Sequence, residues 1–181
     1  LDGERAAYAC TRPPGHHVTR TCFGGSCYLN NTATAAARLR AGGHATVAVV
    51  DVDVHHGNGT QAIFWDDPTV LTGSVHVDPA EGWFPHYLGF EDERGVDGSN
   101  RNAVMAPGSG DESWVAAVSE LGAWAAEAGV EALVVALGAT AAQSVLGSVP
   151  TLPDFTPAGL VAPQIPWIPV AIIVVATAAL T

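Results

Sequence analysis

Three short apolar runs, rich in β-branched residues, most constrain the fold of this 181-residue chain. They lie at Thr46–Val52, Val70–His76 and Glu131–Leu137, and their nearly uniform apolar character is typical of strands buried on both faces. Helical patterns occur at Asn30–Ala41 and Asp111–Ala128. Because strands alternate with helices, the sequence predicts an α/β fold, an open parallel sheet with helices on both faces.

Charge is distributed unevenly along the chain. There are 18 acidic residues against 7 basic ones, a net charge of −11, and no charged residue follows Asp154. A chain this acidic is not expected to bind nucleic acid, because affinity for phosphates rests mainly on Lys and Arg. It would instead attract cationic ligands, although acidity is also a common means of staying soluble.

The cysteines and the apolar tail indicate the cellular compartment in which the protein is expected. Cys10, Cys22 and Cys27 are too few for a disulfide framework, so we expect reduced thiols and a cytoplasmic protein. The tail 160–181 is the one membrane candidate, but its uninterrupted apolar run is about half the roughly 20 residues that a spanning helix needs. A buried strand at Val170–Val175 is the preferred interpretation, with a membrane segment as the weaker alternative.

Polar side chains follow the first of the predicted strands. Asp51, Asp53 and His55 alternate with Val52 and Val54, and on an extended backbone all three would point the same way. Two carboxylates and an imidazole at the carboxyl end of a strand predict half of a divalent metal site, suited to Zn²⁺ or Fe²⁺. The alternative is a polar strand end with its hydrogen bonds satisfied, which would leave two acids buried without a cation.

Histidines mark two further positions. In Arg12–His17 the prolines and glycine predict a turn that presents His16 and His17, a pair able to supply a general acid and a general base near neutral pH. Ser74–His76 ends the next predicted strand with alternating polar side chains. Ser74–His76 lies where ligands of parallel sheets bind, outside the carboxyl ends of the strands.

A long connection separates the second strand from the next helix. The stretch between Val77 and Asn102 is rich in Gly, Pro and acids and contains Trp83 and Phe84. Connections of this length are usually functional, so we expect a loop that contributes to the site.

In this order, the motifs resemble the zinc-dependent histone deacetylase and acetylpolyamine amidohydrolase superfamily, and in particular its bacterial class II-like branch. The matching segments are Arg12–His17, Gly25–Asn31, Val50–Gln61, Asp66–Leu71, Ser74–His76 and Phe84–Gly95. The resemblance covers residues 11–137 and implies an arginase/deacetylase-like domain over residues 1–181, with a diverged C-terminal region at 138–181. The domain is expected to be incomplete at both ends.

The resemblance also implies roles for individual residues. Asp53 and His55 match two of the three protein ligands of the catalytic zinc. His17 matches the general base that deprotonates the attacking water and later protonates the amine, and His16 matches its partner histidine. Asn58 stands where this branch has the residue that orients the second histidine. The implied substrate is an acetylated amine, either a small cationic acetylpolyamine or acetyl-lysine.

Further implied roles concern the surroundings of the zinc site. Asp51 is expected to hold His16 and, together with Ser74, to contribute to a monovalent-cation site with K⁺ as the candidate ion. Gly25 and Ser26 are expected to contact the substrate.

Two features of the family's pattern are missing. After Ala132–Leu137 the family has Gly, one residue and a zinc-binding Asp, whereas this chain has Thr140 in that slot. The family also has an oxyanion-binding tyrosine in a Gly-Gly-Tyr segment, and none of the tyrosines here has that context, namely Tyr8, Tyr28 and Tyr87. Two hypotheses therefore stay open, a zinc-dependent deacylase and a truncated, catalytically impaired relative. An arginase-like two-manganese site is disfavoured, because it needs further clustered acids.

Overall fold

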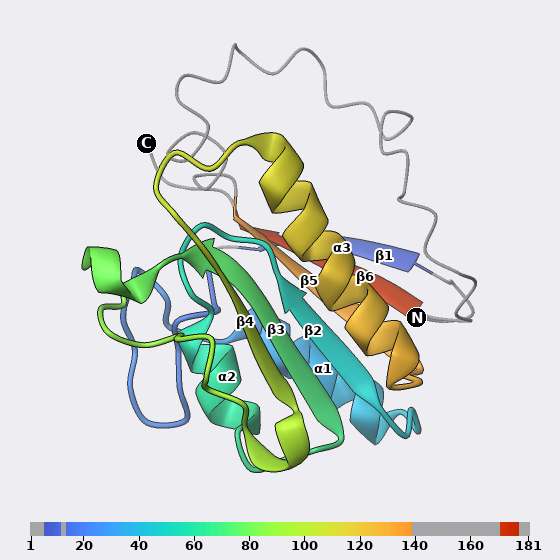
Figure 1. Ribbon diagram of the computed structural model, residues 1–181. Coiled ribbons are helices and arrows are strands. Elements are labelled where there is room, and N and C mark those ends of the chain that lie inside the picture. Colours follow the sequence, from blue (N-terminus) through green and yellow to red (C-terminus); the bar gives the residue numbers. More distant parts are fainter. Residues whose placement is uncertain (1–5, 12–13, 139–170, 178–181) are drawn as a thin grey trace.

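Residues 6–11, 14–138 and 171–177 are described by the computed structural model, and their strands form a six-stranded parallel sheet (Figure 1). The order across the sheet is β1-β6-β5-β2-β3-β4, and every neighbouring pair is parallel. The bounds are Ala6–Thr11 for β1, Val47–Asp51 for β2, Val70–Val77 for β3, Asn100–Met105 for β4, Ala132–Gly138 for β5 and Ala171–Thr177 for β6.

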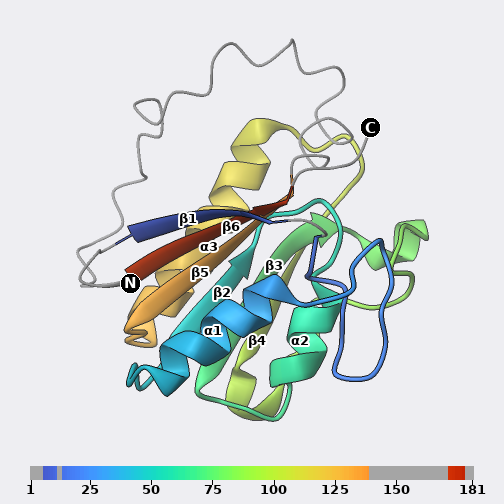
Figure 2. The same cartoon turned by 180° about the vertical axis from the view of Figure 1, so that it is seen from behind.

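Helices cover both faces of this sheet, as predicted. α1 (Asn31–Ala41) and α2 (Asn58–Phe64) lie on one face, and α3 (Asp111–Glu127) lies on the other (Figures 1 and 2). α1 begins where the side chain of Asn30 accepts a hydrogen bond from the backbone N–H of Ala33, which satisfies a free donor of the first turn.

The two faces of β2 explain its apolar run. Val47 and Val49 pack with α1 in one buried cluster, whereas Ala48 and Val50 pack with α3 in another. The α3 residues buried there are Leu121, Trp124 and Ala125. A strand with a helix on each side must be apolar at successive positions, so uniform hydrophobicity replaces alternation.

The C-terminal tail contributes a strand rather than a membrane segment. β6 pairs with β1 on one side and β5 on the other, so a strand in this part of the tail is confirmed, over Ala171–Thr177 rather than Val170–Val175. Within the part of the chain that the structure describes, no helix is long and apolar enough to cross a membrane. Thr140 and the other residues at 139–170 and 178–181 lie outside the described residues.

The backbone after Asp51 differs from the predicted extended strand. β2 ends at Asp51, and the N–H of Asp53 donates to Asp51 Oδ1 at 3.0 Å. The N–H of His55 then donates to Asp53 Oδ1 at 2.8 Å. Each carboxylate thus captures the N–H two residues further on, the geometry of an Asx turn, and this competes with continued extension. The prediction of an extended backbone through His55 was wrong.

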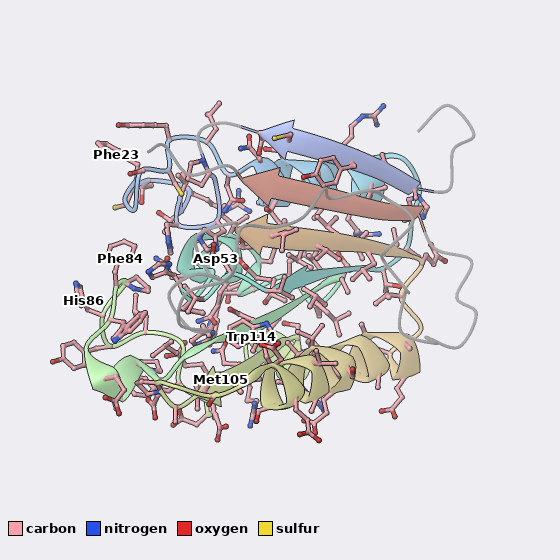
Figure 3. All side chains as sticks on the ribbon, turned by 90° about the horizontal axis from the view of Figure 1, so that it is seen from above. Phe23, Asp53, Phe84, His86, Met105 and Trp114 are labelled. Carbon is pink, nitrogen blue, oxygen red and sulfur yellow. The ribbon has the colours of Figure 1, made fainter. Side chains whose placement is uncertain are left out.

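The connection after β3 is also shorter than expected, because β4 already begins at Asn100. Two short 3₁₀ turns lie within it, at Pro79–Glu81 and Val96–Gly98. Figure 3 shows Asp53 and Phe84 at the edge of the sheet to which the strand arrows point, so this connection and the turns after β2 meet at the carboxyl ends of the strands.

Candidate active site

Two adjacent histidines are presented by the loop between β1 and α1. Gly15 allows this loop to pass close to the start of α1, since a Cβ atom at this position would lie 2.5 Å from the backbone nitrogen of Asn31. The carbonyl of His16 accepts hydrogen bonds from the N–H groups of Gly59 and Thr60, at 2.9 and 3.2 Å. The start of α2 therefore fixes the backbone of the histidine pair.

His16 is paired with a carboxylate. Its Nδ1 lies 2.7 Å from Asp51 Oδ2, and both residues are buried. Burial alone would lower the pKa of His16, but the charge of Asp51 and its hydrogen bond outweigh burial and raise the pKa to about 9. His16 is thus an imidazolium at neutral pH that donates Nδ1–H to Asp51. Gly57 packs directly against the Asp51 carboxylate, because a Cβ atom there would lie 2.3 Å from Asp51 Oδ2.

His17 is in the opposite state although its ring centroid is only 3.9 Å from that of His16. Burial and the positive charge of His16 lower the pKa of His17 to about 3, so the ring is neutral. Its Nδ1 lies 2.8 Å from the side-chain oxygen of Asn58 and donates to it. A neutral imidazole that donates from Nδ1 keeps its lone pair on Nε2, where it can accept a proton.

Gly25 and Phe84 flank the ring of His17. The Phe84 and His17 rings meet edge to face, with centroids 4.7 Å apart. Gly25 has φ +55°, and a Cβ atom there would lie 2.3 Å from Cδ2 of His17 and 2.8 Å from the Phe84 ring, so only glycine allows this approach. Ser26, also expected to contact the substrate, follows with φ +61° and is exposed.

Asp53 and His55, which the sequence predicts as half of a metal site, lie close together. Burial raises the pKa of Asp53, but the hydrogen bonds and charges of His55 and His16 outweigh it and the pKa is lowered, so the carboxylate is ionised. Asp53 Oδ1 and His55 Nδ1 lie 3.1 Å apart. Two ligands of a tetrahedral zinc ion lie roughly 3.3 Å apart, so the pair fits such an ion. The described residues contain no group of three or more His, Cys, Asp or Glu that could hold a metal.

Asp51 and Ser74 are neighbours on paired strands, as a shared cation site would require. They are opposite each other in the register of β2 and β3, and both line a small cavity with Gly57, Thr60 and Asn100. Ser74 Oγ also bonds Nδ1 of His76 at 2.9 Å.

A second polar cluster, which the sequence did not predict, lies beside the first. Gln61 on α2 and Glu93 in the connection after β3 form a hydrogen bond. Gln61 also bonds the buried ring of His56. Glu93 accepts from the N–H of Gly89, whose carbonyl accepts from the buried ring of His76. Gln61 and Glu93 both lie inside segments that matched the family, but nothing in their spacing indicated that they meet.

The sequence is similar to those of known deacetylases and amidohydrolases. The family model of the histone deacetylase domain matches residues 1–144. The acetylpolyamine amidohydrolase of Mycoplana ramosa is 45% identical over 139 residues, which cover 75% of this chain and 40% of that protein. Histone deacetylase 8 of Arabidopsis thaliana is 42% identical over 122 residues, 65% of this chain and 32% of that protein.

Solved structures agree with these sequence matches. The crystal structure of an acetylpolyamine aminohydrolase from Burkholderia pseudomallei superposes with a TM-score of 0.76 at 35% identity and covers 98% of this chain. The match spans 52% of that chain, and the sequence spans about 40% of the length of the curated acetylpolyamine amidohydrolases it matches.

Proposed function

This chain belongs to the histone deacetylase domain family, and from that membership we propose that its site is that of a zinc-dependent deacylase acting on an acetylated amine. The observation that carries the proposal is the contact between two histidine rings whose hydrogen-bond partners differ in charge, Asp51 for His16 and Asn58 for His17. His16 is held charged by Asp51, and His17 is held neutral beside Asn58. Hydrolysis of an amide needs such a neutral base to take a proton from water.

The roles of the two histidines follow from their partners. Nε2 of His17 accepts a proton from the attacking water and then donates it to the nitrogen of the leaving amine, so the base is regenerated. His16 keeps its own proton throughout, because Asp51 stabilises the imidazolium. Its positive charge favours the negative charge that develops on the substrate carbonyl oxygen as water attacks.

Asp53 and His55 are the residues that would hold zinc. When bound, the metal would polarise the amide carbonyl and lower the pKa of water. Phe84 and Gly25 leave only narrow space beside His17, which suits a slender acyl group. The net charge of −11 and the relatives that are named acetylpolyamine amidohydrolases support a cationic amine, with acetyl-lysine as the other candidate.

Turnover by the zinc-loaded chain tests this proposal. We expect release of acetate from acetylputrescine or an acetyl-lysine peptide, and loss of about 10²–10⁴-fold in rate for His17→Gln. His44→Gln, in the turn that follows α1, is the matched control and should keep its rate. Folded, zinc-loaded protein without turnover on either substrate would contradict the proposal.

A specific observation favours a second candidate, a catalytically impaired member of the family. The described residues offer two metal donors rather than three, and Thr140 occupies the sequence position of the third. On this hypothesis Thr140→Asp should raise zinc affinity by about tenfold or more, measured by competition with a chelating dye. Ala141→Asp is the matched control. Unchanged affinity in Thr140→Asp would place residue 140 outside the metal site.

A further inference from the structure

The connection after β3 contains a turn that is closed by one carboxylate. Glu93 Oε1 accepts hydrogen bonds from the backbone N–H groups of Gly89 and Phe90, at 2.9 and 3.1 Å. Five residues before this turn, the same connection places the ring of Phe84 against His17. The position of this turn therefore helps to set the position of Phe84, which forms one wall of the site.

The turn is also seated against the sheet. Nε2–H of His76 donates to the carbonyl of Gly89 at 2.8 Å, and the side-chain amide of Asn102 donates to the carbonyl of Phe90 at 3.1 Å. Gly89 has φ +95° and packs directly on His56, since a Cβ atom would lie 2.6 Å from Cγ of that ring. The turn has no room to shift toward the sheet.

Gln61 connects this turn to α2. Its Nε2 donates to Glu93 Oε2 at 2.5 Å. Its Oε1 accepts from Nε2–H of His56 at 2.9 Å and from the side-chain amide of Asn102 at 3.1 Å. Gln61 lies one helical turn after Asn58, the residue that binds His17.

We propose that Gln61 and Glu93 are positioning residues that fix the Phe84 wall against the proposed base His17. One short helix holds both sides of this contact: Asn58 fixes the histidine, and Gln61, through Glu93, fixes the connection that carries the phenylalanine. The inference depends on the proposed function only for the role given to His17, because the contacts themselves need no turnover.

The hydrogen bonds between Gln61 and Glu93 have a strict direction. Glu93 faces three donors and Gln61 Oε1 faces two, so Glu93→Gln would direct one amide N–H₂ at another. Exchanging the two residues restores the pattern. In the double variant Gln61→Glu/Glu93→Gln, Glu at 61 accepts from His56 and Asn102 and from the new Gln, whose own oxygen accepts from the turn.

The nuclear magnetic resonance signal of the His17 Cδ2–H proton reports the contact, because the ring current of Phe84 shifts it. The signal is identified by its loss in His17→Gln, and Phe84→Leu gives its position without the ring current. We expect the signal in Glu93→Gln and in Gln61→Ala to move toward the Phe84→Leu position. It should return in the exchanged double variant and stay in place in Glu91→Gln, an exposed acid in the same connection.

The outcomes separate positioning from mere support of the fold. A residue that only stabilised the fold would lower the melting temperature without moving the His17 signal of the folded protein, and that result would overturn the inference. So would a signal that moves in Glu93→Gln and does not return in the double variant. If Glu93→Gln does not fold, Gln61→Ala and the double variant decide the matter in the same way. Absence of deacylase turnover would count against the proposed function and leave this readout unaffected.

Discussion

At the scale of single residues, the site depends on the partner that each histidine has been given. His16 and His17 are consecutive, both buried and in ring contact, yet one is charged and the other neutral. The difference arises because Asp51 offers an anionic acceptor and Asn58 offers a neutral one. An acid and a base can thus share one pocket of low dielectric constant when their outer partners differ in charge.

This contrast predicts the effect of giving His17 a charged partner. Asn58→Asp keeps the size of the side chain and places a carboxylate on Nδ1, so we expect the pKa of His17 to rise from about 3 by at least one unit. Asn58→Ala removes the hydrogen bond, which now favours the protonated ring, and should not raise the pKa. A pH titration of the imidazole proton signals in metal-free protein measures both. An equal rise in both variants would show that solvent entry rather than charge sets the pKa.

Residue identities at the site could be predicted from the sequence, but their geometry could not. The motifs identified His16, His17 and Asn58, and the structure brings them together as the resemblance implied. The predicted route for Asp53 and His55 was an extended strand, whereas Asx turns gather these side chains. Periodicity describes the backbone only where carboxylates do not compete for its N–H groups.

At the scale of elements, α2 is the junction of the site although it has only seven residues. It has no side-chain cap at its start; instead, the carbonyl of His16 accepts the N–H groups of Gly59 and Thr60. The helix and the histidine loop are therefore packed backbone against backbone, and glycine at position 59 makes this possible.

Gly59→Ala tests that packing. Its Cβ atom would lie 2.3 Å from the carbonyl oxygen of Val18 and 2.5 Å from the carbonyl carbon of His17, so backbone must move. We expect the free energy of unfolding to fall by about 1–3 kcal/mol, measured by urea denaturation. Gly122→Ala in α3 is the matched control, because no atom apart from the neighbouring backbone of its own helix lies within 4 Å of its Cβ position, and there alanine should stabilise by about 0.5–1 kcal/mol. Equal effects of the two changes would contradict this account of α2.

Two elements that sequence patterns missed, β4 and α2, each have a physical reason for being missed. The apolar strands β2, β3 and β5 were predicted to within two residues at each end, because burial on both faces leaves an uninterrupted β-branched run. β4 has buried asparagines in place of such a run, since Asn100 and Asn102 donate hydrogen bonds to the carbonyls of Glu93 and Phe90 in the connection after β3. α2 is too short to show a helical period and opens on Asn-Gly, a turn signal.

At the scale of the whole molecule, the carboxyl edge of the sheet concentrates buried histidines. His16, His17, His56 and His76 are each less than a tenth exposed. Burial lowers the pKa of the last three, to about 3 for His17 and His56, whereas Asp51 raises that of His16 to about 9. Buried histidines that favour the charged form and buried histidines that favour the neutral form therefore lie together at the carboxyl edge of the sheet.

These shifts predict a stability optimum near pH 6.5–7 for the metal-free chain. Above pH 6.5 the unfolded chain has lost the His16 proton that the folded chain keeps until about pH 9, so stability falls as pH rises through that range. Below pH 6.5 the unfolded chain takes up protons on His17 and His56, whereas in the folded chain these rings stay neutral down to about pH 3, so stability also falls on acidification. Each proton changes the free energy of unfolding by about 1.4 kcal/mol per pH unit, and the two histidines make the acid side steeper.

Urea denaturation between pH 5 and 9 measures this profile, and one variant isolates its alkaline side. Asp51→Asn removes the charge that raises the pKa of His16, so the loss of stability between pH 6.5 and 9 should disappear while the acid side remains. His44→Asn, far from the carboxyl edge, should keep both sides of the profile. If stability were flat from pH 6.5 to 9 in the unchanged chain, His16 would not be the charged member of the pair, and the division of acid and base between His16 and His17 would be wrong.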